Sequence, residues 1–411
     1  MAEMAGVEGV EKGISRPNVA DVVVIGGGII GCSVAYHLAR AGAGRVVLLE
    51  RAAGLGLQTS GSGAGFVSLW ASEVERPWDA LELGLERYGL AFYRELGAAH
   101  DIGLKEVGMA RIALGPEEAR RQHKQHEGGQ ARLAPGELAL LSPREVAAVT
   151  RGAVEPARVS SALYWPAALR VNTSLTVDAL GRELEALGVS VRTGTAVTGI
   201  GTDGGRVTGV ETARGRISTP AVVVAAGAWL GELAAMVGAA LSFSPLIAVR
   251  FTTEPVPALP AAMPMLIFAD YYDMWVREED GGLLAGAYYE PAVRAQRRPS
   301  NPLPSDIAEL PTDLGPYAHD LALGLAPALP AFAGARLKTV RAGLPAYTPD
   351  GRHLLGPVAG VSGLYVVGGD NEAGISHGPG LGKLAAELAV AGKASQDISA
   401  FAPGRFAARP V

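Results

Sequence analysis

The chain has 411 residues, of which 48% are hydrophobic and 19% are charged, so it can bury a large core and is not a disordered polymer. Its net charge is −5 and it carries no basic stripe, which excludes a typical nucleic-acid-binding surface. The single cysteine, Cys32, excludes an internal disulfide, and no run of 18 apolar residues predicts a membrane span.

A chain of this length is expected to form two lobes rather than one core. Residues 1–18 are polar and mixed in charge, without the apolar segment of a secretory signal. We expect them to form a disordered tail, and we expect the protein to be cytoplasmic.

The first predicted elements form a strand–helix–strand unit. Residues 21–25 are short, β-branched and bounded by glycine, as in a buried strand, and residues 45–49 repeat this pattern. Between them, residues 29–42 place apolar side chains on one helical face. A helix between two buried strands predicts a parallel sheet.

The later elements are predicted from the same periodicities. Helices are expected at 76–99, 116–127 and 173–187. Short strands are expected at 189–192, 196–200, 206–212, 216–219 and 221–226, then near 265–277 and 282–289. The last seventy residues predict a strand at 363–367, a glycine-rich turn and a helix at 380–392.

A dinucleotide-binding motif lies at the first strand–helix junction. Gly26, Gly28 and Gly31 satisfy G-x-G-x-x-G, and Glu50 ends the second strand, 19 residues after Gly31. Glycines here allow a tight turn, close approach of main-chain N–H groups to a pyrophosphate, and close packing of the helix. The Glu50 carboxylate can accept hydrogen bonds from ribose hydroxyls and would repel a 2′-phosphate, which disfavours NADP.

The strand–helix–strand unit alone does not distinguish NAD from FAD. A loop rich in hydroxyl groups and glycine, residues 59–65, follows the second strand and suits a second stretch of pyrophosphate and ribityl chain. A glycine-punctuated strand at 221–227 and a glycine cluster at 368–380 lie far away in sequence. A long ligand buried across a sheet needs several such separated contacts, so these features favour FAD.

Several motifs in order resemble one family. They are V-V-V-I-G-G-G-I-I-G (22–31), L-L-E-R (48–51), the 59–65 loop, A-A-G-A-W (225–229), A-G-L-P-A-Y-T-P-D-G (342–351) and Y-V-V-G-G-D-N-E-A-G-I-S-H-G-P-G-L-G-K (365–383). Together they resemble the D-amino-acid oxidase superfamily, of the glycine oxidase, sarcosine oxidase and dimethylglycine dehydrogenase type. The resemblance spans about 20–406.

The resemblance implies an α/β chain (α+β overall) with a Rossmann-like FAD-binding domain and a second, antiparallel-sheet substrate domain. We assign the discontinuous FAD-binding domain to residues 19–75, 150–240 and 335–411. The substrate-binding domain is assigned to residues 76–149 and 241–334.

The resemblance also implies which residues contact FAD. They are Gly26, Gly28, Ile29, Ile30, Gly31, Glu50, Arg51, Thr59, Ser60, Ser62, Gly63, Ala64, Gly65, Val197, Ala226, Gly227, Trp229, Gly343, Asp370, Asn371, Gly374, Ile375 and Ser376. Sarcosine-oxidase-like members attach FAD through a cysteine where this chain has Ala342 and Gly343. Dimethylglycine-dehydrogenase-like members use a histidine where it has Ser62. We therefore expect FAD to be bound non-covalently.

The customary groups that grip a substrate carboxylate are missing. Glycine-oxidase-like members have an arginine at the position of Pro345, and sarcosine-oxidase-like members have a lysine at Ser376. An α-amino-acid substrate then requires a substitute such as Arg277 or Arg341. The lysine that helps some of these oxidases react with oxygen aligns near Leu284, which favours another electron acceptor.

The reacting end of the site has three sets of candidates. The N-terminus of helix 380–392 can stabilise negative charge on a reduced flavin, which we favour over the alternative that Gly378-Pro379-Gly380 is only a helix-starting turn. Aromatic residues of two predicted strands can form an apolar cage that disfavours an ammonium ion, with Trp275 first and Tyr288 second; ordinary sheet packing is the alternative. His377 is a candidate for substrate contact or proton relay, or is a buried histidine satisfied by the main chain.

These features predict a flavoenzyme that transfers hydride from a small secondary or tertiary amine or an amino acid to flavin N5, giving an imine that hydrolyses. Oxygen or another acceptor would take the electrons, and an oligomer is possible. Two alternatives stay open: a dehydrogenase of a 2-hydroxy acid or related alcohol, and an FAD-holding subunit of a larger complex. No metal site, nucleic-acid partner or membrane span is expected.

Overall fold

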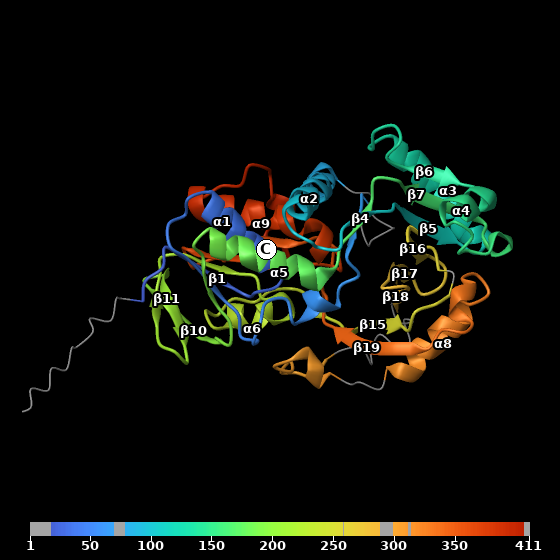
Figure 1. Cartoon of the computed structure of the whole chain (residues 1–411). Coiled ribbons are helices and arrows are strands. Elements are labelled where there is room, and N and C mark those ends of the chain that lie inside the picture. Colours follow the sequence, from blue (N-terminus) through green and yellow to red (C-terminus); the bar gives the residue numbers. More distant parts are fainter. Residues whose placement is uncertain (1–17, 70–78, 258, 288–298, 311–313, 407–411) are drawn as a thin grey trace, which may run out of the picture.

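The computed structural model describes residues 18–69, 79–257, 259–287, 299–310 and 314–406. Two sheets, each with its own covering helices, lie side by side along the long axis of the molecule (Figure 1). Within the described ranges, no helix combines the length and the apolar character needed to cross a bilayer.

The first sheet has six strands and contains the predicted strand–helix–strand unit. Its order is β21 (Leu354–Pro357), β22 (Leu364–Gly368), β13 (Val222–Val224), β1 (Val22–Ile25), β2 (Val46–Leu49) and β9 (Ser190–Arg192). All neighbouring pairs are parallel except β21 with β22. The central strands are buried throughout, as their unbroken valine and leucine runs predict.

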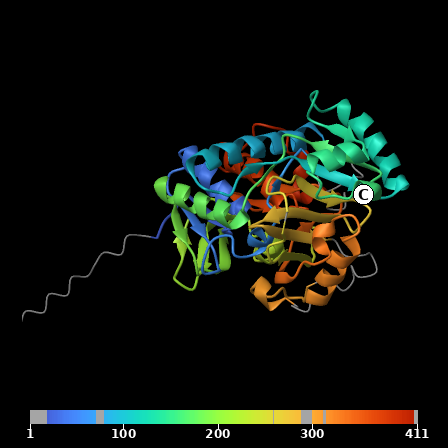
Figure 2. The ribbon, with the colours of Figure 1, turned by 45° about the vertical axis from the view of Figure 1, so that its right-hand side comes forward.

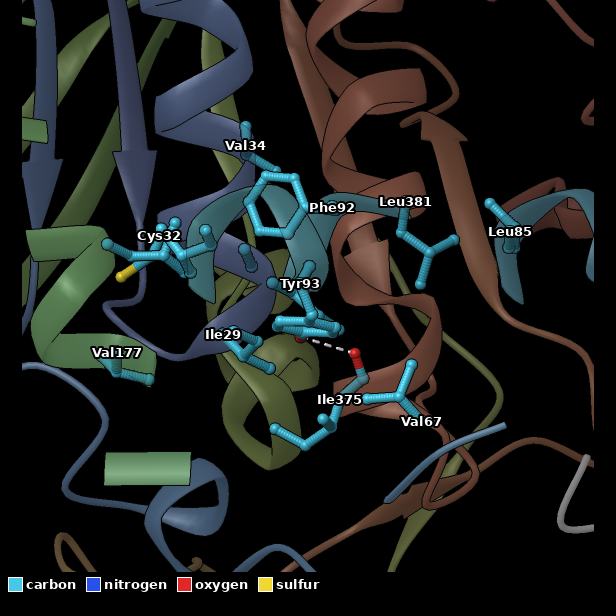
Figure 3. Packing of buried hydrophobic residues seen from close by; sticks show 14 of the residues in the cluster. Ile29, Cys32, Val34, Val67, Leu85, Phe92, Tyr93, Val177, Ile375 and Leu381 are labelled. Atoms are coloured by element: carbon cyan, nitrogen blue, oxygen red, sulfur yellow. Dashed lines mark hydrogen bonds between the residues drawn. The ribbon is translucent and has the colours of Figure 1, made fainter. Parts of the chain in front are cut away.

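Helices cover one face of this sheet and a small sheet covers the other. The helices are α1 (Ile29–Arg40), α2 (Ala80–Ala99), α5 (Thr173–Ala186) and α9 (Gly374–Ala391). Their apolar faces share one buried cluster, part of which is drawn in Figure 3. The small sheet consists of β10 (Val197–Asp203), β11 (Arg206–Thr212) and β12 (Ile217–Ser218), and α6 (Leu230–Ala235) packs on the same side.

Helix α9 begins at Gly374, six residues before the start predicted at 380. Pro379 has no N–H to donate to the carbonyl of Ile375, which ordinarily breaks a helix. Here the hydroxyl of Tyr93, a fully buried residue of α2, donates to that carbonyl at 2.7 Å (Figure 3). The tertiary hydrogen bond replaces the missing helical one, so the helix extends by more than a turn toward the sheet.

The second sheet has eight strands. Its order is β19 (Leu337–Gly343), β15 (Ala248–Thr253), β18 (Gly282–Ala287), β17 (Met274–Glu279), β16 (Met265–Phe268), β5 (Met109–Ala113), β7 (Ser161–Trp165) and β6 (Ala139–Leu141). Apart from the parallel pair β16 and β5, its neighbours are antiparallel. Helices α3 (Pro116–Gln130), α4 (Pro143–Val149) and α8 (Gly315–Leu325) pack against it, and α8 lies on its outer face (Figure 2).

The strand predicted near 265–277 is wrong, because the chain reverses in its middle. Tyr272 and Asp273 have positive φ angles of 56° and 44°, and β16 and β17 pair as an antiparallel hairpin across this turn. The remaining short strands connect the two halves: β3 (Phe66–Val67), β8 (Leu169–Arg170) and β4 (Lys105–Glu106) form one sheet, and β14 (Ser244–Pro245) pairs with β20 (Ala346–Tyr347).

Two segments join a different half from the one that the predicted domain boundaries give them. Strand β7, within the segment 150–240 assigned to the FAD-binding domain, pairs with β5 and β6 in the eight-stranded sheet. Helix α2, assigned to the substrate domain, packs against α9 and α1 beside the six-stranded sheet. Local sequence pattern does not report such pairings, because they are made with segments far away in the chain.

Candidate functional site

A cavity of about 370 Å³ lies between the two sheets. Its walls come from the ends of β1, β2 and β13, the loop that contains η1 (Thr59–Ser62), the start of α9, and strands β15 to β18. Of the residues predicted to contact FAD, those on the wall are Gly26, Gly28, Ile29, Ile30, Glu50, Arg51, Thr59, Ser60, Ser62, Gly63, Ala64, Val197, Ala226, Gly227, Trp229, Gly343, Asp370, Gly374, Ile375 and Ser376. Gly31, Gly65 and Asn371 lie behind it.

The glycine motif shapes the wall at the start of α1. Gly26 has a φ of 113°, and a Cβ there would collide with the carbonyl of Ala225 on the neighbouring strand. A Cβ on Gly31 would overlap the Gly26 carbonyl, so only glycine lets α1 start this close to β1. The N–H of Ile29 points out of the helix start and is bound by the Ser60 hydroxyl at 3.0 Å. The glycines therefore bring the start of α1 directly to the cavity wall, and a helix start is where pyrophosphates bind.

Glu50 and Arg51 lie at the far end of this wall. The Glu50 carboxylate is buried and accepts the N–H groups of Gly27 at 2.6 Å and Ala52 at 2.7 Å. The guanidinium of Arg51 stacks on the Trp229 ring at 3.9 Å from its centroid, and its Nη2 is buried without a partner among the described residues. Desolvation lowers the pKa of Arg51. An unpaired cation and a fixed carboxylate suit the phosphates and ribose of a dinucleotide.

The 59–65 loop is fastened to the end of β19. The Ser62 hydroxyl donates to the Ala342 carbonyl at 2.8 Å, and the Thr59 hydroxyl accepts the N–H of Leu344 at 3.1 Å. A Cβ on Gly343 would lie 3.3 Å from the Cβ of Ser62. These are the two positions at which the resemblance implies covalent attachment of FAD in different relatives. They meet at one point on the cavity wall, and neither carries a reactive side chain here.

The glycine-rich turn before α9 is held in an unusual conformation. Asn371 and Glu372 have positive φ angles of 45° and 65°, in a region that costs a non-glycine residue energy and often marks a functional site. The Asn371 side chain fixes the turn by accepting the N–H of Thr348 at 3.0 Å and donating to the Gly369 carbonyl at 2.8 Å. Asp370 lines the cavity beside it, and desolvation raises its pKa to about 6.

The start of α9 supplies the end of the cavity that faces the second sheet. Gly374, Ile375 and Ser376 line it, and they are the first residues of an 18-residue helix. The positive end of the helix dipole thus points at the cavity. The helix start for which an electrostatic role is predicted therefore lies at Gly374–Ser376 and not at the Gly378-Pro379-Gly380 turn.

Aromatic side chains form the opposite wall. Trp275 of β17 lines the cavity and meets Phe66 of β3 edge to face, with ring centroids 5.8 Å apart. A Cβ on Gly286 of the next strand would collide with the Trp275 indole, so the indole lies over that glycine. Met109 and Ile267 complete this wall. Tyr288, the second predicted aromatic residue, lies outside the described residues.

His377 does not line the cavity. It is 2% exposed and lies in a buried polar cluster in which its Nδ1 is 2.6 Å from His353 Nε2 and its Nε2 is 2.9 Å from Glu86 Oε1. The other ring nitrogen of His353 is 3.0 Å from the Gly369 carbonyl and therefore donates to it. His353 Nε2 therefore faces His377 Nδ1, and His377 Nε2 faces the Glu86 carboxyl group. Burial raises the pKa of Glu86.

This placement changes the role expected of His377. Its side chain contacts a second histidine and a carboxylate instead of the cavity or the main chain, whereas its neighbour Ser376 lines the cavity. Glu86 and His353 give no motif in the sequence, because they come from a helix and a strand edge far from His377.

The two predicted substitutes for the carboxylate anchor also lie outside the cavity wall. Arg277 is 1% exposed and donates to the Ala64 carbonyl at 2.7 Å and to Glu279, so it fastens the 59–65 loop to β17. Arg341 lies on an outer strand and is exposed. Arg250, which sequence reasoning missed, does line the cavity. The only sign of this residue in the sequence is a single charged side chain within the strand A-V-R-F-T-T, whose residues are alternately buried.

Comparisons with known proteins agree with this geometry. Residues 21–388 match the family described as DAO, FAD dependent oxidoreductase. A 4-methylaminobutanoate oxidase (formaldehyde-forming) of Paenarthrobacter nicotinovorans is 30% identical over 95% of this chain, which covers 46% of that protein. A glycine oxidase of Pseudomonas putida is 27% identical over 93% of this chain and 98% of its own length.

A solved structure shows the same fold. The crystal structure of L-proline dehydrogenase from P. horikoshii matches with a TM-score of 0.82 at 21% identity, covering 95% of this chain and 98% of the other. The chain spans about half the length of several curated relatives that it matches. The predicted fold class, resemblance and FAD cofactor are confirmed: the chain belongs to the family of FAD-dependent oxidoreductases to which D-amino-acid oxidase-like enzymes belong.

Proposed function

We propose that this enzyme oxidises a C–N bond of a small secondary or tertiary amine or amino acid. When bound, FAD supplies the hydride acceptor for this reaction. The residues on the dinucleotide wall would hold it without a covalent link, since Ser62 and Gly343 replace the attaching residues of relatives. The relatives named for acting on 4-methylaminobutanoate and glycine support an amine substrate.

The observation that carries the proposal is the aromatic end of the cavity, where Trp275 and Phe66 meet edge to face. Such surroundings disfavour an ammonium ion by desolvation, and only the neutral amine can release hydride. A neutral amine needs no base for this step, because its nitrogen lone pair stabilises the cation that forms, whereas an alcohol must lose its hydroxyl proton as well.

The described residues have separate tasks in this reaction. Trp275 and Phe66 exclude water from the amine and disfavour its ammonium form by desolvation. The positive end of α9 at Gly374–Ser376 stabilises negative charge that develops beside it. The cluster of Glu86, His377 and His353 lies behind Ser376, where it positions the helix start.

The test is anaerobic reduction of the purified holoprotein by panels of amines, amino acids and 2-hydroxy acids. We expect the flavin absorbance to bleach with members of the amine or amino-acid panels. Bleaching by hydroxy acids alone would contradict the proposal. Intact FAD that no panel reduces would favour the FAD-holding subunit.

A further inference from the structure

Arg250 lies beside the aromatic wall of the cavity. On β15 it is directly opposite Gly286 of β18, and Gly286 is directly opposite Trp275 of β17. Residues opposite one another in antiparallel strands point to the same face of a sheet. Because the Trp275 indole lies over Gly286, the glycine leaves no side chain between the indole and Arg250.

Arg250 forms no ion pair among the described residues, although the charge of Glu279 acts on it at longer range. Its Nη1 donates to the Gly61 carbonyl at 2.6 Å, which fixes the guanidinium against the 59–65 loop. Its Nε is buried without a partner, and among the described residues no carboxylate is in contact with it. Desolvation lowers its pKa to about 10, so the side chain remains charged at neutral pH.

Other arginines buried in this half of the molecule do have acid partners. They pair as Arg111 with Glu118 and Asp273, Arg170 with Glu278 and Glu279, and Arg277 with Glu279. A buried charge without a partner is costly, and an anionic ligand would remove that cost. Arg250 therefore has the properties of a binding residue rather than of a structural ion pair.

Arg250 is also the cation on the substrate side of the cavity. Among the described residues the wall contains two arginines, and the other, Arg51, stacks on Trp229 at the dinucleotide end. The positions where relatives grip an α-carboxylate, Pro345 and Ser376, line the cavity but are neutral.

We infer that Arg250 binds the carboxylate of an amine or amino-acid substrate. The inference rests on the proposed function. Arg250 lines the cavity beside Trp275, at a different position from the neutral Pro345 and Ser376.

The first test compares two compounds of equal length, 4-(methylamino)butanoate and N-methylbutylamine, of which only the first carries a carboxylate. Flavin reduction is followed anaerobically in the holoprotein, in Arg250→Gln and in Arg336→Gln. Arg336 is exposed and off the cavity wall, which makes it a matched control.

We expect wild type to bind 4-(methylamino)butanoate more tightly than N-methylbutylamine, which lacks the carboxylate. Arg250→Gln should weaken binding of 4-(methylamino)butanoate roughly 10- to 100-fold, the range for a hydrogen bond to a charged group, and leave N-methylbutylamine unchanged. Arg336→Gln should match wild type. Equal binding of 4-(methylamino)butanoate in Arg250→Gln and wild type would overturn the inference.

The second test separates failure of the inference from failure of the proposed function. Binding of butanoate, which cannot be oxidised at nitrogen, is measured by calorimetry on the holoprotein. Heat of binding in wild type, a partial signal in Arg250→Lys and none in Arg250→Gln support Arg250 as the anion site even if no amine bleaches the flavin. Absence of binding in wild type, or equal binding in all three, would overturn it. Flavin content and melting temperature of each variant report whether it is folded.

Discussion

The two walls of the cavity are built in different ways. The dinucleotide wall consists of main-chain amides and glycines at the ends of parallel strands, with Gly26 and Gly31 forced to be glycine by neighbouring carbonyls. The substrate wall consists of side chains such as Trp275 and Arg250, projecting from an antiparallel sheet. A main-chain wall is specific for a ligand shared by a whole family, whereas a side-chain wall can change its ligand by a single substitution.

Arg277 joins the two walls, and its loss should have the largest effect. Arg277→Gln removes the hydrogen bond to Ala64 and leaves Glu279 with less compensation inside the protein. Removal of one partner of a buried ion pair costs about 3 kcal/mol or more. Chemical denaturation should therefore show a loss of roughly 3 kcal/mol in the free energy of unfolding, with weaker FAD retention. The exposed Arg341→Gln is the control, with a change below about 0.5 kcal/mol; equal changes in the two variants would contradict this role.

Gly31 tests the main-chain wall alone. In Gly31→Ala the new methyl group overlaps the Gly26 carbonyl and must push α1 away from β1. Overpacking of about 1–3 kcal/mol at this point should weaken FAD binding roughly 10- to 100-fold, measured by titrating apoprotein with FAD. Gly315→Ala, where a Cβ meets nothing within 4 Å, should bind FAD as wild type does. An unchanged FAD affinity in Gly31→Ala would show that this wall does not depend on the close approach of α1 to β1.

Tyr93 tests how the start of α9 is held beside the cavity. Tyr93→Phe leaves the Ile375 carbonyl without the hydrogen bond that replaces the one missing at Pro379. An unsatisfied buried acceptor costs about 1–2 kcal/mol. We expect a loss of this size in the free energy of unfolding. Tyr88→Phe, which removes a hydroxyl from a less buried contact with His37, should cost less; the reverse order would contradict the account.

The last predicted effect is the pH dependence due to Asp370. Its pKa is raised from 3.8 to about 6 in the folded protein by desolvation, so folding favours the neutral form. The stability that this carboxyl contributes is fully present below about pH 3.8 and is lost as the pH rises through about 6. Melting temperatures of wild type and Asp370→Asn are measured between pH 4 and pH 7. The melting temperature of wild type should fall relative to that of the variant as the pH rises, because the variant has no carboxyl group to titrate at this position. Parallel curves would show that Asp370 does not titrate in this range.

The dinucleotide wall was largely predictable from the sequence, because main-chain binding leaves its mark as glycines at fixed spacing next to strands. Most residues predicted there, including Glu50 and Ser60, lie on the cavity wall. The early start of α9 was not predictable, since the hydroxyl that replaces the missing hydrogen bond of Pro379 belongs to Tyr93 on another helix. Sequence periodicity describes what a segment favours alone and not what a distant partner adds.

The substrate wall was only partly predictable for the same reason. Trp275 was chosen as an aromatic on a strand, but its neighbour across two strands, Arg250, requires the register of β15, β18 and β17. His377 sits in a conspicuous glycine-rich motif, yet its ring faces Glu86 and His353 instead of the cavity. Side-chain sites assembled across a sheet depend on pairing, and pairing is not local.

The most direct test of the two-wall account is a crystal structure of the holoprotein with FAD and butanoate. We predict the pyrophosphate against the start of α1 at Gly26 and Gly28, the flavin ring between Gly374–Ser376 and Trp275, and the butanoate carboxylate on Arg250. A flavin ring at the Arg51 end of the cavity, or a carboxylate bound away from Arg250, would contradict it.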